Sequence, residues 1–370
     1  MNFWQKLKED KKGKPILVLA PMADVTDRAF RRVIAKYGKP DVMWTEFVSA
    51  DGLFHGGYDS LINDLSFGDA ERPIVAQFFT SKPEMMRKAA ALAVTLGFDG
   101  VDINMGCPDK SVEKQGAGAA LIKNPKLAQE IIAGAKQGII DAGGNIPVSV
   151  KTRIGYNKNE LETWLPALLE TYPAMITIHA RTRKEMSLVP ARWEHVKRAV
   201  EIRNELKSDT LIFGNGDVTD ISNALEKAKE TECDGVMLGR AIFGNPFLFS
   251  SNGKEKRPER SEGYVSVEQK LRVLIEHTKL FAELVQPKAP IGQSHLPSLG
   301  GEVTGGQASL PSKCSGNGGQ GKSFAVMKKH FKAYVNGFDG AKELRVALME
   351  QQDASGVERV IEDFLKNNSF

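Results

Sequence analysis

The sequence predicts an α/β protein in which a closed barrel of eight strand–helix units precedes a small C-terminal helical domain. Short runs rich in β-branched residues recur eight times before residue 240, with helix-like segments between them. Beyond residue 264 the periodicity is helical. Because eight units fit within the first 250 residues, which is the usual size of a (β/α)8 TIM barrel, we expect that fold.

The predicted strands have similar lengths and spacings along the first 240 residues. They cover residues 16–20, 42–47, 73–79, 100–104, 147–151, 175–180, 211–215 and 235–239. An open, doubly wound sheet is the alternative arrangement of such units. No GxGxxG motif follows the first strand, which argues against a dinucleotide-binding sheet of that kind.

Composition places the chain among ordinary globular proteins. Of its 370 residues 41% are hydrophobic and 26% are charged, and the net charge of +4 is too small to prove a nucleic-acid partner. The first 15 residues are charged where a signal peptide needs an apolar core, and no apolar run is long enough to span a bilayer. We therefore expect a cytoplasmic protein with no membrane partner.

The three cysteines are widely spaced, and none belongs to a CxxC pair. This pattern indicates neither a disulfide framework nor a zinc site, so no metal is expected. Cys233 and Cys314 are interpreted as small hydrophobic residues. Cys107 differs, because it follows a predicted strand and precedes Pro108 and a glycine-rich turn.

Nearly every predicted strand ends in a group that a barrel core would not need. Because the C-terminal ends of barrel strands form the face where such enzymes build active sites, we expect these groups to meet there. In chain order they are Met22 after Pro21, Glu46, Gln77, Asn104 with Cys107, Lys151 with Arg153, His179 with Arg181, Asn215 with Gly216 and Asp217, and Gly239 with Arg240.

Two glycine-containing segments follow the seventh and eighth strands, GNGDV at 214–218 and GRAIFGNP at 239–246. Barrels often bind phosphate at this position, with loop amides that glycine leaves accessible. Arg240 could add a charge-assisted bond. Lys151 and His179 would then face a phosphorylated cofactor. The alternatives are a buried lysine satisfied by a carboxylate and an ordinary core histidine.

The predicted domains are a barrel at 1–250, a polar linker at 251–263 and a helical domain at 264–370. Helical patterns cover 265–285 and 323–349. The segment from Lys322 to Arg345 contains six basic and two acidic residues. This basic stripe could bind phosphates or simply be a solvated helix face. Residues 286–322 are rich in Gly, Ser and Pro and are predicted to be a flexible insertion.

Several stretches of the barrel, taken together, resemble tRNA-dihydrouridine synthases, flavin enzymes that reduce uridines in tRNA. The stretch DGVDINMGCPDKSVEKQGAGAAL at 99–121 is the most specific. The others are APMADVTDRAFR (20–31), AQFF (76–79), VSVKTRIGY (148–156), ITIHARTR (176–183), GNGDV and GVMLGRAIFGNP (235–246). In the helical domain, MKKHFKAYVNGFDGAKELR (327–345) resembles the tRNA-gripping segment of these enzymes.

The resemblance implies a protein that holds FMN in its barrel and grips tRNA with its helical domain. We also expect NADPH or NADH to be the reductant and the protein to be a monomer. The resemblance assigns FMN contacts to Pro21, Met22, Ala23, Gln77, Lys151, His179, Asn215, Gly216, Asp217, Gly239 and Arg240. It places Asn104, Arg153 and Arg181 toward the uridine or its phosphates, and we add Lys328, Lys329 and Lys332 as tRNA contacts.

The reaction explains the isolated Cys107. Reduction of the uracil C5=C6 bond takes a hydride at C6 from the flavin and a proton at C5 from the protein. A thiol with an ordinary pKa near 8.5 holds its proton at neutral pH and can release it to a developing carbanion. Cys107 is therefore expected to be the general acid. Gly116 and Gly118 would let its loop fold back, and Val112 and Leu121 would anchor it.

The sequence departs from the family at three places. Asp24 stands where glycine is common, residues 185–193 lack the usual tyrosine and glycine, and 286–322 replaces a short connection. Two other functions are considered. A small-molecule FMN oxidoreductase of the dihydroorotate dehydrogenase type would not need the 99–121 loop or the basic helical tail, and a non-catalytic RNA-binding barrel would not need Cys107, Lys151 and His179.

Overall fold

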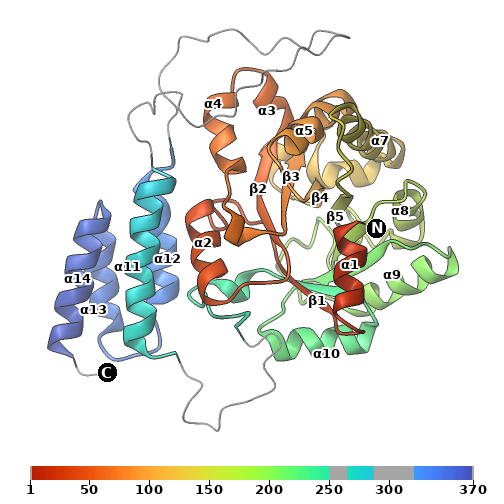
Figure 1. The fold of residues 1–370 in the computed structure, drawn as a ribbon. Helices are drawn as coiled ribbons and strands as arrows, with labels where there is room; N and C mark the ends of the chain where they lie inside the picture. The colour runs from red at the N-terminus through yellow and green to blue at the C-terminus, as the bar shows by residue number, and fades with distance from the viewer. Residues whose placement is uncertain (1, 251–264, 287–320, 369–370) are drawn as a thin grey trace.

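The structure, a computed structural model, describes residues 2–250, 265–286 and 321–368. These ranges contain eight parallel strands that form the centre of the molecule (Figure 1). The strands are β1 (Ile16–Leu19), β2 (Met43–Ser49), β3 (Ile74–Phe79), β4 (Gly100–Met105), β5 (Val148–Arg153), β6 (Met175–His179), β7 (Leu211–Asn215) and β8 (Gly235–Leu238). All eight predicted strands are confirmed, with boundaries within two residues.

The order of the strands shows that the sheet curls into a barrel. Each strand from β2 to β8 pairs with its neighbours in the sequence, and β1 pairs with β8. Val18 and Val42 form a parallel bridge between the remaining edges, and the Asp41 amide donates to Leu17 O at 2.9 Å. The TIM-barrel prediction is therefore confirmed, and the open doubly wound sheet is wrong.

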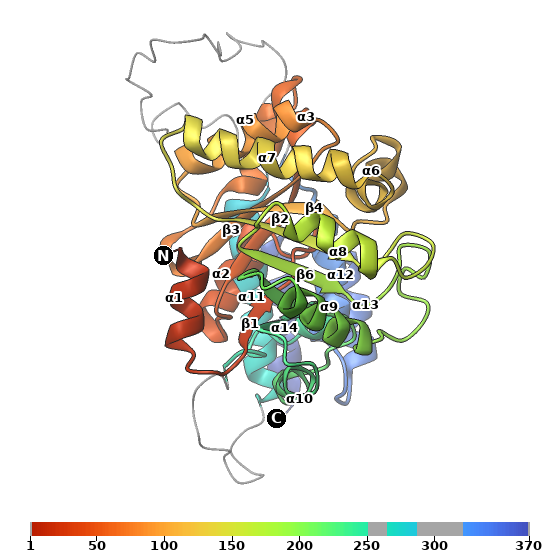
Figure 2. The same ribbon diagram turned by 90° about the vertical axis from the view of Figure 1, so that its right-hand side faces the viewer.

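Helices follow most strands and cover the outside of the barrel, as Figure 2 shows for the side formed by α7, α8, α9 and α10. In the barrel part the α-helices are α1 (Phe3–Asp10), α2 (Arg28–Tyr37), α3 (Ala50–Phe54), α4 (Tyr58–Leu61), α5 (Pro83–Thr95), α6 (Lys110–Lys114), α7 (Pro125–Asp141), α8 (Leu161–Leu169), α9 (Glu194–Glu205) and α10 (Ile221–Thr231). Short 3-10 helices are η1 (Ile62–Leu65), η2 (Asp69–Glu71), η3 (Gly118–Lys123) and η4 (Arg240–Ile242).

Helix α1 closes the N-terminal end of the barrel. Its Trp4 is 1% exposed and packs against Trp44 and Phe213, with ring centroids 5.7 and 5.5 Å away. These rings belong to an apolar cluster with residues of β1, β3, β6 and β8. The N-terminal half of the barrel interior is thus an apolar core. Polar side chains can therefore gather at the C-terminal end.

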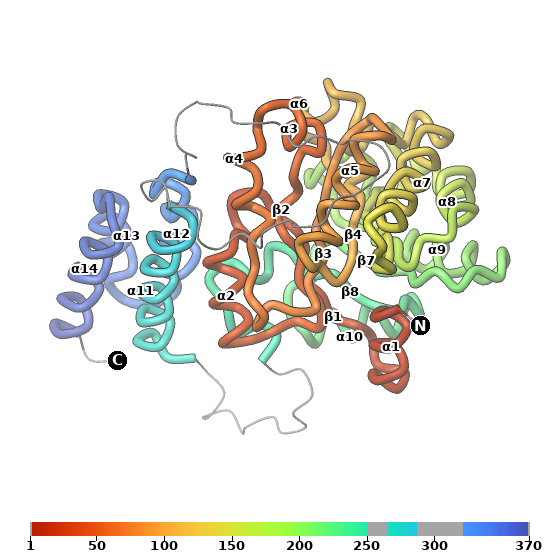
Figure 3. Tube along the Cα trace, turned by 45° about the horizontal axis from the view of Figure 1, so that its top comes forward, coloured from red at the N-terminus to blue at the C-terminus, as the bar shows by residue number. Residues whose placement is uncertain are grey.

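The C-terminal domain is a group of four α-helices that lie side by side next to the barrel (Figure 3). They are α11 (Val267–Leu284), α12 (Met327–Tyr334), α13 (Ala341–Glu350) and α14 (Ala354–Asn367), and η5 (Phe324–Val326) precedes α12. The prediction of one continuous helical segment at 323–349 is wrong. Gly337 and Gly340 have φ of 77° and 80°, in the left-handed region that ends a helix.

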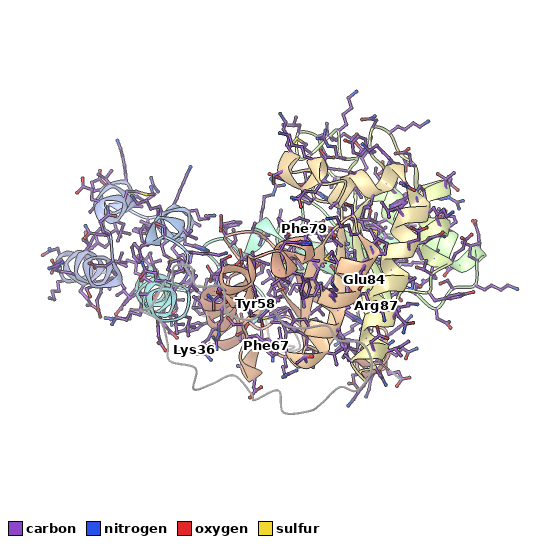
Figure 4. The ribbon with its side chains drawn as sticks, turned by 90° about the horizontal axis from the view of Figure 1, so that it is seen from above. Lys36, Tyr58, Phe67, Phe79, Glu84 and Arg87 are labelled. Carbon is purple, nitrogen blue, oxygen red and sulfur yellow. The ribbon has the colours of Figure 1, made fainter. Side chains whose placement is uncertain are left out.

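The helical domain docks on the barrel through α11 and α2. His277 of α11 stacks on Phe30 of α2, with ring centroids 4.9 Å apart. At the edge of this contact Lys36, labelled in Figure 4, bonds Glu276 of α11 at 2.8 Å, and Tyr37 donates to the same carboxylate at 2.6 Å. The docking surface is therefore apolar at its centre and ionic at its rim.

Gly244 lets the segment after β8 touch the helical domain closely. A Cβ at this position would lie 2.0 Å from Ala333 O of α12, and the residue has φ of 70°. Any side chain would therefore meet α12 backbone in a strained conformation. The glycine of the GRAIFGNP segment thus joins the two domains.

Two predicted segments lie wholly or largely outside the described residues, namely the linker 251–263 and the insertion 286–322. The described ends of the insertion meet, because the Lys322 amide donates to Val285 O at 3.1 Å. In the described ranges no helix has the length and apolar character that a membrane span requires.

Candidate active site

A cavity of about 230 Å³ opens at the C-terminal ends of β1, β5, β6, β7 and β8. Nine of the residues predicted to contact the cofactor line it, namely Pro21, Met22, Lys151, His179, Asn215, Gly216, Asp217, Gly239 and Arg240. Of the other two, Ala23 is exposed nearby and Gln77 is fully buried inside the barrel. Residues predicted from separate strand ends therefore meet at one cavity.

Asp217 links the two arginines of this cavity. One carboxylate oxygen accepts from the Arg181 guanidinium and from Ala191 N–H, and the other accepts from Arg240 at 2.7 Å. The bond from Arg181 is the main cause that lowers the pKa of Asp217, so it is ionised at neutral pH. Gly216 before it has φ of 127°, and a Cβ there would lie 2.8 Å from that of Ala191. The GNGD segment thus orients two guanidinium groups.

Lys151 provides a positive charge inside the cavity. Burial lowers its pKa to about 8, and Arg153 acts in the same direction, so the ammonium form still dominates at neutral pH. Its hydrogen-bond partner in the described part of the chain is Asn215 Oδ1 at 3.4 Å, an amide oxygen rather than a carboxylate. The ammonium group is therefore available to a ligand.

His179 is a neutral imidazole. Burial lowers its pKa well below the usual value, and the nearby cations Arg153, Lys151 and Arg181 lower it further. Its Nε2 lies 3.1 Å from a guanidinium nitrogen of Arg181, which can only donate. Nε2 must therefore accept, and the ring proton is on Nδ1.

Cys107 lies in a loop that turns back on itself after β4. Its carbonyl accepts from Ala119 N–H at 3.0 Å. Gly118, with φ of 60°, makes this closure possible, because a Cβ there would lie 2.8 Å from Cys107 O and from Val112 Cγ1. Val112 and Leu121 are 3% and 1% exposed, so both predicted anchors of the loop are buried.

The Cys107 side chain is half-buried. Burial is the main cause that raises its pKa, and it outweighs the positive charges of Lys151 and Arg153, which lower it. The sulfur is therefore a protonated thiol at neutral pH. This is the state that a proton donor needs and a nucleophile lacks.

The three residues predicted to face the uridine are buried, and two of them, Asn104 and Arg153, contact this loop. Asn104 Oδ1 accepts from Gly106 N–H and Cys107 N–H at 3.1 and 2.9 Å. Arg153 donates to Gly106 O at 2.7 Å, and Arg181 donates to the carbonyl of Val189 at 2.6 Å besides contacting His179 and Asp217. In this structure all three support the protein backbone, and their contact with substrate stays a prediction.

Comparison with known proteins identifies the family. A family model for dihydrouridine synthase (Dus) matches residues 18–294. This chain belongs to the dihydrouridine synthase family. It is 37% identical over 365 residues to the probable tRNA-dihydrouridine synthase 2 of Bacillus subtilis. The alignment covers 98% of this chain and 96% of that protein. A probable tRNA-dihydrouridine synthase of Staphylococcus aureus is 36% identical, over 98% and 95% of the two chains.

The chain also resembles solved structures at low sequence identity. Histamine dehydrogenase from Rhizobium sp. 4-9 aligns with 12% identity and a TM-score of 0.49, over 72% of this chain and 49% of that one. A resemblance this weak has no bearing on the function of this dihydrouridine synthase family member.

Beside the cavity, a cluster of carboxylates surrounds Lys322. Its Nζ lies 2.7 and 2.6 Å from the two oxygens of Glu46, and 3.4 and 3.5 Å from Asp24 and Asp64. Burial alone would lower the pKa of Lys322, but these carboxylates outweigh it and raise the pKa. Lys322 is thus an internal cation and not part of a phosphate-binding stripe.

The three lysines predicted to contact tRNA lie on α12. Lys329 and Lys332 are exposed, and Lys328 is half-buried. Lys329 Nζ lies 3.8 Å from Asp24 Oδ2, which belongs to the segment between β1 and α2. Lys329 therefore stands next to the segment that leads from β1 toward the candidate active site.

Sequence reasoning missed two acidic residues of the site. Glu113 of α6 forms a bidentate ion pair with Arg183 and ties the Cys107 loop to the segment after β6. Asp102, in the middle of β4, is 0% exposed and bonds Gln77 and Ser149. A carboxylate between two apolar strand residues was a signal that could have revealed Asp102.

No group of three or more His, Cys, Asp or Glu side chains suited to a metal ion occurs in the described ranges.

Proposed function

We propose that this protein reduces particular uridines in tRNA to 5,6-dihydrouridine, with FMN as its bound cofactor and NADPH or NADH as the reductant. The position of Cys107 carries the proposal. Its half-buried thiol lies in a loop closed by Gly118, near a cavity that contains Lys151, His179 and Arg240. Family membership and the names of the relatives support the same substrate.

The residues of the cavity fit a phosphorylated flavin. Arg240 and Lys151 supply positive charge, and the loops after β7 and β8 present Gly216 and Gly239, which have no side chain to block an anion. His179 is neutral and can hydrogen-bond an anion through Nδ1–H without adding charge. Gln77, Ala23 and the Pro21–Met22 segment complete the set that we assign to FMN.

Reduced FMN, when bound, supplies the hydride that C6 of the uracil accepts. Cys107 donates the proton to C5 from Sγ and becomes a thiolate, which regains a proton from solvent. The raised pKa of the thiol keeps this proton in place until negative charge develops on C5. Lys151 stabilises the thiolate that remains, since its charge already favours that form.

We propose that Asn104, Arg153 and Arg181 orient the uridine, and that Lys328, Lys329 and Lys332 bind tRNA phosphates. The exposure of Lys329 and Lys332, and the position of Lys329 near Asp24 of the segment after β1, support this placement. We expect the protein to act as a monomer in the cytoplasm.

The decisive experiment measures dihydrouridine in tRNA at each position, in cells that lack the protein and in cells that carry it again. One or more positions should lose dihydrouridine in the deletion strain and regain it with the wild-type protein, but not with Cys107→Ala. An unchanged dihydrouridine map in the deletion strain would show that the proposed function is wrong.

Flavin binding needs a separate experiment. Purified protein should be yellow and should release FMN on denaturation, whereas Arg240→Ala with Lys151→Met should retain much less. Lys207→Met, an exposed lysine before β7 at the other end of the barrel, is the control and should keep its FMN. A colourless wild-type protein that also fails to bind added FMN would exclude a flavin mechanism.

A further inference from the structure

A continuous chain of buried hydrogen bonds connects β5 to the Cys107 loop across the inside of the barrel. It begins at Ser149, whose hydroxyl donates to Asp102 Oδ1 at 2.6 Å. Gln77 Nε2 donates to the other oxygen of Asp102 at 2.6 Å, and Gln77 Oε1 accepts from Asn104 Nδ2 at 3.1 Å. Asn104 Oδ1 then accepts from the N–H groups of Gly106 and Cys107. The side chains of Ser149, Asp102, Gln77 and Asn104 are all buried.

The groups at the two ends of this hydrogen-bonded network cannot reverse: the Asp102 carboxylate only accepts, and the loop N–H groups of Gly106 and Cys107 only donate. Gln77 and Asn104 are amides, and each can present either its oxygen or its NH2 group to a neighbour. The ionised carboxylate of Asp102 can only accept, so Gln77 must turn its NH2 group toward it. Gln77 Oε1 then faces Asn104, which must turn its own NH2 group toward Gln77 and its oxygen toward the loop.

The last bond is the important one for the site. Gly106 and Cys107 both present an N–H group to Asn104. If Asn104 were reversed, its NH2 group would face two donors, and three buried donors would lack an acceptor. Each such loss leaves a buried polar group without a partner and so destabilises the closed position of the loop.

We propose that Asp102 is a positioning residue: it holds the amides of Gln77 and Asn104 in the orientation that the loop N–H groups require, and so steadies the backbone of the loop that carries Cys107. Its contribution to uridine reduction rests on the proposed function, but its control of the loop does not.

Asp102 remains an acceptor under ordinary conditions. Burial raises its pKa to about 6, while the bonds from Ser149 and Gln77 and the charge of Lys151 oppose the rise. The carboxylate form therefore dominates at neutral pH. Burial of a carboxylate at this depth is costly, which is consistent with a specific role.

The test compares single substitutions that break the chain with a double substitution that reverses it. In Asn104→Asp a carboxylate lies on each side of the Gln77 amide. Gln77 can donate to only one of them, so its oxygen must face the other carboxylate, which cannot donate to it. In Asp102→Asn with Asn104→Asp, Gln77 can turn over, accept from Asn at 102 and donate to Asp at 104. The carboxylate at 104 still accepts both loop amides, and the net charge equals that of the wild type.

Native-state alkylation of Cys107 by iodoacetamide, quantified for each cysteine peptide by mass spectrometry, reports the position of the loop without any tRNA. Asn104→Asp and Asp102→Leu should alkylate at least tenfold faster than the wild type. Each breaks a bond of Gln77 that holds residue 104 in place, so the loop can shift and expose the thiol. Asp102→Asn alone should stay within about threefold, because the new amide can turn its oxygen toward Gln77 and leave the other bonds unchanged. The double substitution should return to within about threefold of the wild type.

Ser149→Ala is the matched control, because it removes a donor to Asp102 without changing the acceptor that faces Gln77. It should alkylate like the wild type. The proposal is wrong if Asn104→Asp alkylates like the wild type, or if the double substitution is as reactive as Asn104→Asp alone. Melting temperatures identify variants that have lost the fold, and restoration by the second substitution cannot result from general destabilisation. A wild-type protein that did not reduce tRNA would contradict the proposed function and leave this result intact.

Discussion

Lys322 Nζ bonds both carboxylate oxygens of Glu46, at 2.7 and 2.6 Å, although the two residues are 276 positions apart in the chain. Glu46 is in the middle of β2 and only 4% exposed. Lys322 lies just before η5 and α12, so this pair fixes the start of that segment to the barrel.

The pair leads to a prediction about the inserted segment. Replacement of residues 287–320 by a short Gly-Ser link should leave tRNA reduction within a few-fold of normal, because Lys322 N–H and Val285 O already hold the two ends together. The same replacement with Lys322→Met should lower the free energy of unfolding by an amount on the order of 3 kcal/mol, since Glu46 loses its buried partner. Activity assays and urea denaturation measure the two effects.

An alternative result is equally clear. If the shortened protein folds normally, keeps Lys322 and still loses all activity on tRNA, residues 287–320 take part in substrate binding.

The lysines of α12 lead to a second prediction, about tRNA binding. Replacement of Lys328, Lys329 and Lys332 by glutamate should weaken tRNA binding at low salt by more than tenfold and should reduce the salt dependence of the affinity, because fewer counterions are released. The FMN content should not change. Filter binding or fluorescence anisotropy across a series of salt concentrations measures the effect.

The matched control is glutamate at Lys14, Lys207 and Lys229, which are exposed and precede β1, β7 and β8 at the opposite end of the barrel. This control changes the net charge equally and should bind tRNA much more tightly than the α12 variant. Equal affinities for the two variants would mean that total charge, and not the α12 surface, determines binding.

A third prediction concerns acid stability of the domain contact. His277 and His330 lie edge to face, with ring centroids 4.6 Å apart, and no ring nitrogen of either has a hydrogen-bond partner among the described residues. Burial lowers the pKa of His330 to about 3 and that of His277 well below its usual value. Between about pH 6.5 and pH 3 the unfolded chain therefore binds protons that the folded protein excludes.

The sign follows from this difference. The free energy of unfolding that the two neutral histidines contribute is fully present above about pH 6.5. It falls as the pH decreases, by up to about 2.7 kcal/mol per pH unit for His277 and His330 together. Glu46 and Asp102, whose pKa values are raised to about 7 and about 6, act in the opposite direction in part of this range. A comparison with His277→Leu/His330→Leu cancels their effect, because both proteins contain these carboxylates.

The measurement is the free energy of unfolding of both proteins from pH 7.5 to pH 5. The wild type should lose stability relative to the double-leucine variant as the pH falls below about 6.5. Parallel pH curves for the two proteins would show that the histidines are not responsible.

The sequence was sufficient to predict the barrel and most of the cavity, for a physical reason. Buried strands are recognisable as β-branched runs, and the barrel brings their C-terminal ends together, so polar residues such as Lys151 and His179 could be assigned to one site. The glycine of the 106–118 loop could be interpreted similarly, since Gly118 occupies a conformation that other residues avoid.

Other features depend on three-dimensional contacts that no local pattern encodes. The contact between Lys322 and Glu46 joins distant segments, and Trp4 lies in a helix in which half of the residues are charged. Two glycines, Gly337 and Gly340, could have predicted the break before α13, and both have left-handed φ values in the structure. The apolar residues on both sides keep a helical spacing, which concealed this signal.

The last prediction separates two half-reactions at Cys107. Reduction of bound FMN by NADPH requires no proton at C5 of a uracil, so Cys107→Ala should keep its yellow colour and should bleach with NADPH at the wild-type rate. Its turnover on tRNA should fall by about 10²- to 10⁴-fold, the usual contribution of a positioned acid. Cys107→Ser should recover little, because a hydroxyl is a much weaker acid than the thiol.

Single-turnover reoxidation of the reduced enzyme by tRNA decides the matter, because it isolates the step in which the proton is transferred. The Cys107→Ala enzyme should reoxidise at least a hundredfold more slowly, and the deficit should not depend on tRNA concentration once the enzyme is saturated. If reoxidation is as fast as in the wild type, Cys107 does not donate the proton, and its burial next to Lys151 serves only the packing of the loop.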